Sequence, residues 1–217
     1  MLNPMAVTRD EYTTLGARGR AETKVHASRF IARAMPVHDR AAIDAALETV
    51  RKEYHDATHH CYAYRLGADG GDFRAHDGGE PSGSAGRPIL AAIDREGLSD
   101  VLVVVTRYFG GTKLGVGGLM KAYGAAAGAA MASAPRMKLF ALEKIEISFP
   151  HEMVGPVMHV CASTGANIAS TDYNGEVHLH LEIRTSRADE LRAALLDRTR
   201  GGVTFLDAEI PPGHTDS

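Results

Sequence analysis

The stretch Val101–Gly115, VLVVVTRYFGGTKLG, joins a strand, a glycine-rich loop and the start of a helix. Its first five residues are all apolar, which is typical of a strand that is covered on both faces. Arg107 and the pair Gly110-Gly111 follow directly, and a helical pattern begins near Leu119. This order favours a mixed domain of strands and helices, with backbone N–H groups gathered at one edge of its sheet.

The residues on either side of this stretch predict the rest of the first domain. The segment Gly67–Pro88 is a long glycine-rich connection, and structureless loops of about 20 residues are uncommon inside domains unless they have a function. Hydrophobic periodicity predicts a strand over Thr23–Ala34, a helix near Asp39–Tyr54, a strand over His60–Leu66, and helices over Ile89–Glu96 and Leu119–Ala132.

The last of these helices is rich in alanine and glycine. Gly124 and Gly128 each cost about 1 kcal/mol relative to alanine, so close packing of this helix on the sheet is the expected compensation. The predicted buried face consists of Met120, Tyr123, Ala127 and Ala130.

Residues 145–205 contain strand and helix patterns in the order β-α-β-β-α-β, which is the ferredoxin-like arrangement. Asn174-Gly175 is a type I′ turn signal between the two middle strands, because both positions need positive φ. Ser186 and Asp189 resemble a capping box at the second helix. The predicted buried side chains are Ile145, Ile147, Phe149, Val154, Val157, Met158, Cys161, Val177, Leu179, Leu181, Ile183, Leu191, Ala194 and Leu195.

Charge and composition divide the chain at Ser133–Arg136, after the alanine-rich helix. Residues 1–135 carry 16 lysines and arginines against 15 acidic residues, and residues 136–217 carry 8 against 12. We therefore expect an α+β protein of two domains, 1–135 and 136–217. The whole chain has a net charge of −3, which is unlike the high pI of a typical nucleic-acid-binding protein.

The sequence favours a cytoplasmic protein without a membrane span. No apolar run approaches the roughly 18 residues that cross a bilayer, and Met1–Asp10 lacks the apolar segment of a secretory signal. Cys61 and Cys161 give no disulfide framework and are expected to be small core residues. No acidic or cysteine partner accompanies His55 and His59 at ligand spacing, so we expect neither a metal nor a cofactor.

The glycine loop after the buried strand is the strongest candidate for a binding site. Its N–H groups and the positive end of the following helix can face an anion, and Arg107, Lys113 and Lys121 add positive charge. Nucleotide fingerprints fail here, because Gly115 is followed by valine and Met120 stands where the dinucleotide pattern needs glycine or alanine. The alternative is a tight turn whose glycines only permit close packing.

A second glycine-rich segment, Asp77–Pro88, carries charged and hydroxyl residues. We expect Asp77, Glu80 and Ser84 to fix this loop or to act as polar partners, with Glu80 paired to Arg107. A catalytic carboxylate at Glu80 is the alternative. Ser84 is expected at or near the cap of the next helix, since a nucleophilic serine needs a neighbouring base. Because no complete catalytic set is present, we name no catalytic residue and favour a non-enzymatic protein.

These two loops resemble the IMPACT/YigZ family of small cytoplasmic proteins. Gly86–Leu90 and then Val104–Gly115 reproduce the family signature in residue type and spacing. Gly78 stands where the family usually has a second aspartate, which argues against paired carboxylates. Other family-like segments are Lys24–Ile31, Ala57–His59, Asp77, Glu80-Pro81, Gly117–Leu119 and Tyr123-Gly124.

The resemblance covers nearly the whole chain and implies its two folds. Residues 1–135 resemble the IMPACT N-terminal domain, which has a ribosomal-protein S5 domain 2-like fold. Residues 136–217 resemble the YigZ C-terminal domain, which is ferredoxin-like and similar to a domain of elongation factor G. Eukaryotic members regulate translation initiation by binding a partner protein, and nucleic-acid binding has been suggested for bacterial members.

Our favoured hypothesis is a non-enzymatic, translation-associated protein that binds RNA or the ribosome through an anion-binding pocket. Phosphate contacts of this kind would weaken steeply with added salt. The residues expected to form the pocket are Arg87, Arg107, Gly110, Gly111, Lys113 and Lys121.

Two alternatives stay open. One is an enzyme that holds a phosphorylated small molecule in the glycine loops. The other is a module that binds a translation-related protein through the sheet face that carries His178, His180 and Glu182. The sequence leaves the oligomeric state open.

Overall fold

The computed structural model describes residues 10–206, so the ends of both expected domains lie outside the described residues. The described chain forms two compact units, Glu11–Leu139 and a second unit that begins at Phe140 and includes Asp10. Both units mix helices with sheet, as predicted for an α+β protein of two domains. A boundary at residue 135 stays a prediction. Within residues 10–206, no helix is both long and apolar enough to span a membrane.

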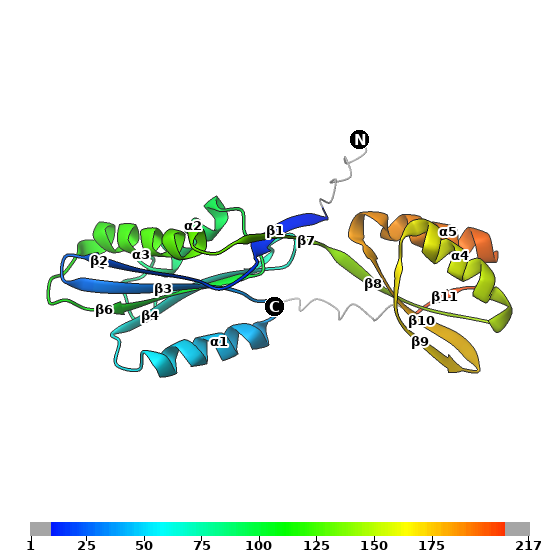
Figure 1. Cartoon of the computed structure of the whole chain (residues 1–217), viewed down its shortest axis with the longest axis horizontal. Helices are drawn as coiled ribbons and strands as arrows, with labels where there is room; N and C mark the ends of the chain where they lie inside the picture. The colour runs from blue at the N-terminus through cyan, green and yellow to red at the C-terminus, as the bar shows by residue number, and fades with distance from the viewer. Residues whose placement is uncertain (1–9, 207–217) are drawn as a thin grey trace, which may run out of the picture. The chain divides into compact units, whose positions relative to one another are not determined.

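The first unit is built on a five-stranded antiparallel sheet in the order β2-β3-β6-β4-β5. Helix α1 covers one face, and α2 and α3 cover the other (Figure 1). A separate two-stranded ladder pairs β1 with β7. The bounds are β1 Glu11–Leu15, β2 Gly19–Val25, β3 Ser28–Pro36, α1 Arg40–Glu53, β4 His59–Leu66, β5 Asp72–His76, α2 Gly86–Arg95, β6 Val101–Tyr108, α3 Gly115–Ala132 and β7 Arg136–Phe140.

Strand β6 lies at the centre of this sheet, and the prediction that it is covered on both faces is confirmed. Val101, Val103 and Val105 face the core beneath α2 and α3. Leu102 and Val104 face the core beneath α1. Because side chains alternate along a strand, a continuous apolar run serves both cores. Each fully buried side chain of this kind contributes about 1.5 to 3 kcal/mol.

Two element predictions for the first unit are wrong. Thr23–Ala34 is a hairpin of β2 and β3, not one strand, and its turn passes through His26 at φ 50°. The sequence did not indicate this turn, because its two residues, His26 and Ala27, are not usual turn residues. The connection Gly67–Pro88 contains the edge strand β5, whose side chains are mostly exposed and give no apolar pattern.

Helix α3 also differs from its prediction. It begins at Gly115, and Met120 is 46% exposed while Leu119 and Tyr123 are buried. Gly124 faces helix α2 instead of the sheet, because a Cβ placed there would lie 3.6 Å from the Pro88 carbonyl oxygen. That distance is ordinary contact, so close packing does not require glycine at this position.

The second unit has the predicted element order β-α-β-β-α-β. Its four strands form an antiparallel sheet in the order β11-β8-β10-β9, and α4 and α5 pack on one face of it (Figure 1). The bounds are β8 Leu142–Phe149, α4 Val154–Thr164, β9 Asn167–Asn174, β10 Glu176–Arg184, α5 Ala188–Thr199 and β11 Thr204–Phe205, with short 3-10 helices at His151–Met153 and Thr185–Arg187.

The predicted alternation in β10 is confirmed, since its four apolar side chains are all buried. Two finer predictions are wrong. Val154 and Met158 of α4 are 37% and 44% exposed, because the buried face of this helix consists of Val157, Val160, Cys161 and Thr164. Ser186 makes no capping box, because its hydroxyl donates to the carboxylate of Asp10 instead.

We predict that Gly19→Ala destabilises the protein by about 1 to 3 kcal/mol, the usual cost of overpacking. A Cβ at Gly19 would lie 2.1 Å from the backbone oxygen of Ala130 in α3, so strand and helix must separate. The matched control is Gly117→Ala in α3, where nothing lies within 4 Å and alanine favours the helix. Urea-unfolding midpoints measure both, and equal stability of the two variants would contradict this packing.

Candidate anion-binding site

Arg107, near the end of β6, is turned into the protein. Its side chain is only 4% exposed, and Nη1 donates to Oε1 of Glu80 at 2.6 Å. Nη2 donates to the Ser28 hydroxyl at 3.1 Å, and the guanidinium lies 5.5 Å from the Phe30 ring centroid. The Glu80 side chain is equally buried. The positive charge of Arg107 is therefore balanced inside the protein and is not a free surface charge.

The Glu80 carboxylate lies close to side chains of three elements, which are β6, α3 and β4. The Tyr123 hydroxyl of α3 donates to the same Oε1 at 2.7 Å, and Nε2 of His59 lies 3.8 Å away. Burial raises the pKa of Tyr123 well above its ordinary value. Burial also raises the pKa of Cys61 to about 12, and its thiol donates to the Asp77 carbonyl at 3.0 Å. Both groups are protonated at neutral pH, so neither is a ready nucleophile.

The loop before α2 is organised by the Asp77 carboxylate. It accepts backbone N–H bonds from Gly83 at 2.8 Å, Ala85 at 3.0 Å and Gly86 at 2.8 Å. Burial alone would raise the pKa of Asp77, but these three bonds outweigh it and lower that pKa. Ser84 is buried, and its hydroxyl donates to the Pro81 carbonyl at 2.6 Å. Ser84 directly precedes the N-cap residue Ala85, so it lies near the cap as predicted, but the side chain that accepts the N–H groups at the start of α2 is that of Asp77.

The second glycine loop divides into a packed part and an open part. The Gly110 amide donates to the Ser28 hydroxyl at 3.2 Å, and a Cβ at Gly110 would lie 2.0 Å from the Ala27 backbone. Gly111 is exposed, at φ 86°, with open space around it. The prediction of close packing therefore fits Gly110, whereas Gly111 leaves room for a ligand.

Helix α3 starts at Gly115 without a side-chain cap. The N–H groups of a first helical turn have no partner within the helix, and they carry the positive end of its dipole. Lys113 precedes this turn and is exposed. Among the described residues, no carboxylate pairs with it. The start of α3 and Lys113 thus present positive charge to solvent.

A pocket of about 370 Å³ opens beside this helix start. Phe109 is 46% exposed in it, and the Arg107 guanidinium lies 5.4 Å from its ring centroid. The lining also includes His59, whose Nδ1 donates to the Gly78 carbonyl at 3.0 Å. The remaining lining residues are Glu80, Pro81, Lys113, Leu114, Gly115, Val116 and Leu119.

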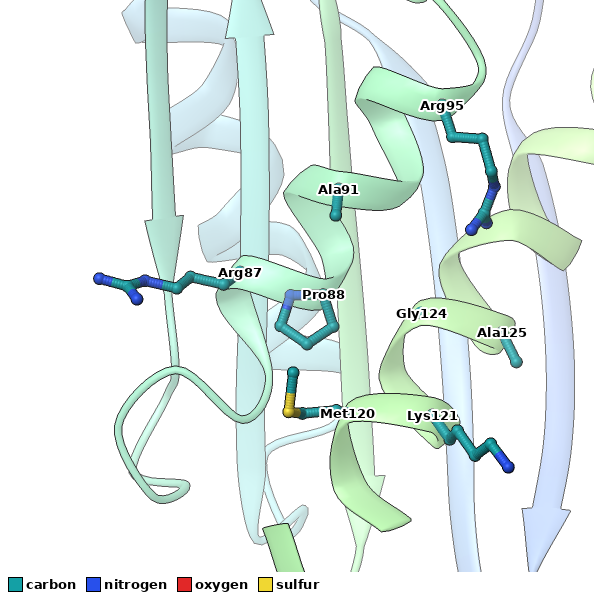
Figure 2. Close-up of a pocket in the computed structure, with 8 residues that line it drawn as sticks. All are labelled: Arg87, Pro88, Ala91, Arg95, Met120, Lys121, Gly124 and Ala125. Atoms are coloured by element: carbon teal, nitrogen blue, oxygen red, sulfur yellow. The ribbon is translucent and has the colours of Figure 1, made fainter. Parts of the chain in front are cut away.

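The predicted cations fall in two places. Arg107 and Lys113 line this pocket, whereas Arg87 and Lys121 line a second hollow between α2 and α3 (Figure 2). Sequence reasoning missed Phe109 and Arg95. Phe109 stands inside the glycine signature, so its position was a usable signal. Arg95 carries no such signal, because it is one charged residue on an amphipathic helix.

Metal binding is not supported by the described residues. Between residues 10 and 206, no group of three or more histidine, cysteine, aspartate or glutamate side chains has the geometry to hold a metal ion. His59 and Cys61 are instead bonded to the carbonyls of Gly78 and Asp77.

The chain is thus an α+β protein of two compact units, in which a buried arginine–glutamate pair lies beside a glycine-loop pocket. The description "Impact N-terminal domain" matches residues 26–131, and "Domain of unknown function (DUF1949)" matches residues 147–201. The chain belongs to the IMPACT family.

Individual relatives agree with this membership. "IMPACT family member YigZ" of Escherichia coli is 32% identical over 188 residues, which cover 86% of this chain and 92% of the relative. "IMPACT family member in pol 5'region" of Thermus thermophilus is 44% identical over 135 residues, covering 61% and 71%. A solved structure described as "Crystal structure of an hypothetical protein" has a TM-score of 0.71 at 30% identity, covering 93% of this chain and 99% of that one.

We predict that Glu80→Gln destabilises the protein by about 3 kcal/mol or more, because it leaves the buried Arg107 charge without its counter-ion. The matched control is Glu48→Gln, since Glu48 pairs with Lys52 on the exposed face of α1. That change should leave the unfolding free energy almost unchanged, because water screens an exposed ion pair. Denaturant unfolding measures both, and similar losses for the two variants would contradict the central role of the pair.

We predict that Asp77→Asn destabilises the protein at neutral pH by about 1 to 2 kcal/mol, because the amide cannot accept the Gly83 N–H bond. The folded-state pKa of Asp77 lies below 3.8. The contribution of the ionised carboxylate is therefore present above that pH and is lost as the pH falls through the folded-state pKa. Unfolding free energies of wild type and variant should converge only in strong acid. A constant difference at every pH would be the contrary result.

Proposed function

We propose that the chain is a non-enzymatic, translation-associated protein that binds single-stranded RNA, free or on the ribosome, through the pocket at the start of α3. The observation that carries this proposal is the meeting of Lys113, the uncapped first turn of α3 and the half-exposed ring of Phe109 in one pocket. The family resemblance supports the link to translation.

The phosphate of the RNA would lie against the positive groups of the pocket. Lys113 supplies a mobile ammonium group, and the first turn of α3 supplies backbone N–H donors. Arg107 makes no direct contact with the phosphate in this proposal, because its side chain is buried and balanced by Glu80.

A base of the RNA would stack on Phe109. Single-stranded nucleic acids are held by positive grooves that carry exposed aromatic rings, and each stacked base contributes about 1 to 3 kcal/mol. The Arg107 guanidinium lies near this ring, and Arg107 is itself fixed by Glu80 and Ser28. Phe109 therefore packs against a side chain that is itself fixed, and an aromatic ring held in one position favours stacking of a base.

The rest of the predicted set takes other roles in this proposal. Gly110 and Gly111 shape the loop, and Asp77, Glu80 and Ser84 hold the neighbouring loop in place. Arg87 and Lys121 lie outside the pocket, so we leave them out of the phosphate site. We also propose that the first unit has the S5 domain 2-like fold and that the second unit has the ferredoxin-like fold. The β11-β8-β10-β9 order and the β-α-β-β-α-β chain order support the second name.

The experiment is titration of the full chain with a fluorescein-labelled oligouridylate, followed by anisotropy at several salt concentrations. Lys113→Ala should reduce the magnitude of the log–log salt slope by about 0.7, the value for one phosphate contact on a single strand. Phe109→Ala should weaken binding by about tenfold and leave the slope unchanged. The matched control is Lys144→Ala, an exposed lysine of β8 in the second unit.

Lack of wild-type binding at low salt would overturn the proposal. So would equal slopes for Lys113→Ala and Lys144→Ala, since the pocket would then contribute no phosphate contact.

The small-molecule alternative has one specific observation in its favour. The pocket volume of about 370 Å³ lies within the range of about 300 to 1,000 Å³ that is usual for ligand sites. A phosphorylated metabolite would use the same Lys113 contact. Thermal-shift measurement against a nucleotide and metabolite panel separates the two, because a ligand at 100 times its Kd adds about 2.7 kcal/mol of stability. A large shift with one metabolite would favour this alternative over RNA.

A further inference from the structure

We propose that the groove between α2 and α3 is a docking site for an acidic amphipathic peptide segment of a partner protein. The groove has a volume of about 630 Å³ and is separate from the pocket at the start of α3. It is lined by Arg87, Pro88, Ala91, Arg95, Met120, Lys121, Gly124 and Ala125 (Figure 2).

The floor of the groove is apolar and open to solvent. Ala91 of α2 and Ala125 of α3 are both exposed, and Met120 is 46% exposed. Small residues on the facing helices leave the space between them unfilled, since Gly124 carries no side chain opposite Pro88. A flexible methionine beside small residues is a surface that adapts to apolar side chains of a partner. The apolar floor would therefore bind the apolar face of the proposed peptide.

The rim of the groove is positive and its charges have no internal partners. The three cations Arg87, Arg95 and Lys121 form no ion pair with any described residue. Figure 2 shows the side chains of Arg87 and Lys121 pointing outward on opposite sides of the two helices, and the side chain of Arg95 extending from the end of α2 toward α3. Cations thus lie on both sides of the apolar floor, where they would bind the carboxylates of the peptide.

The carboxylates that could neutralise these cations are engaged elsewhere. Asp94 of α2 pairs with Arg65 at 2.6 Å, and Glu96 beyond its end pairs with Arg136 at 2.6 Å. Helix α3 contains no acidic residue. The positive field over the groove is therefore uncompensated, and complementary charge would steer a partner to it and fix its orientation.

The lining favours a peptide over RNA. Among residues 10–206, no aromatic side chain lines the groove, so bases have no ring there on which to stack. An amphipathic helix or extended segment instead places apolar side chains on the floor and carboxylates on the rim, which is the usual groove-binding mode.

The test uses the full chain and a fluorescein-labelled peptide of about 15 residues, roughly four helical turns, with leucine on one face and glutamate on the other. Anisotropy should show saturable binding to wild type. A peptide with lysine in place of glutamate should not bind, and an unlabelled oligouridylate should not compete. Arg95→Glu should weaken peptide binding by about tenfold or more.

A second pair of variants separates docking from folding. Ala91→Glu places a carboxylate in the groove at an exposed position and should abolish binding. Ala129→Glu is its matched control, because Ala129 is exposed on α3 but does not line the groove. Lys113→Ala should leave peptide binding unchanged, so failure of the RNA proposal is distinguishable from failure of this one.

Three results would overturn the proposal. These are no saturable binding of the acidic peptide to wild type, equal binding of the lysine peptide, and equal effects of Ala91→Glu and Ala129→Glu. Displacement of the peptide by the oligouridylate, together with weaker direct binding of a labelled oligouridylate to Arg95→Glu, would reassign the groove to RNA.

Discussion

The buried contact between Arg107 and Glu80 joins strand β6 to the loop that precedes α2. Glu80 also accepts the Tyr123 hydroxyl of α3, so one carboxylate connects the sheet, the loop and the second covering helix. Hydrogen bonds to the remaining polar atoms help a buried ion pair to offset its desolvation cost, and Nε of Arg107 is the one nitrogen of this guanidinium without an acceptor among the described residues. Ser28 supplies one such bond to Arg107 and also accepts the Gly110 amide, which ties the second glycine loop to the same centre.

This arrangement decides which positive groups are available to a ligand. Arg107 is neutralised and acts mainly as a support for Phe109, so the free charge of the pocket comes from Lys113 and from the start of α3. Lys121, further along α3, lines another hollow together with Arg87 and Arg95 of α2, and the floor of that hollow is apolar. One helix thus serves two surfaces of different chemistry. The near balance of charge in residues 1–135 hides this separation, because net charge does not report where the charges lie.

The sequence was most informative where side-chain periodicity is strict. Val177, Leu179, Leu181 and Ile183 predicted β10 and the element order of the second unit, because one residue of slip would reverse the buried face. It was least informative where local signals are weak. The turn at His26 lacks usual turn residues, and β5 is an exposed edge strand without an apolar pattern.

The candidate site was likewise predictable only where the local sequence signals are strong. The glycine spacing located both loops, and opposite charges suggested the Arg107–Glu80 contact. The sequence did not indicate how deeply each side chain is buried, however, so Arg107 was placed with Lys113 among the anion-binding residues. Tyr123 was predicted to be buried, but its bond to Glu80 depends on how α3 packs over the sheet, which no local pattern encodes. The division of cations between two hollows likewise depends on the α2–α3 packing.

The most direct test of the central claim is amide chemical-shift mapping of the full chain by NMR during titration with a short oligouridylate. The account places the ligand on the pocket that the Arg107–Glu80 pair supports. Saturable shifts should therefore concentrate at the amides of Phe109, Lys113 and the first turn of α3 from Gly115. Shifts that concentrate elsewhere, with the Gly115 and Lys113 amides unchanged, would contradict it.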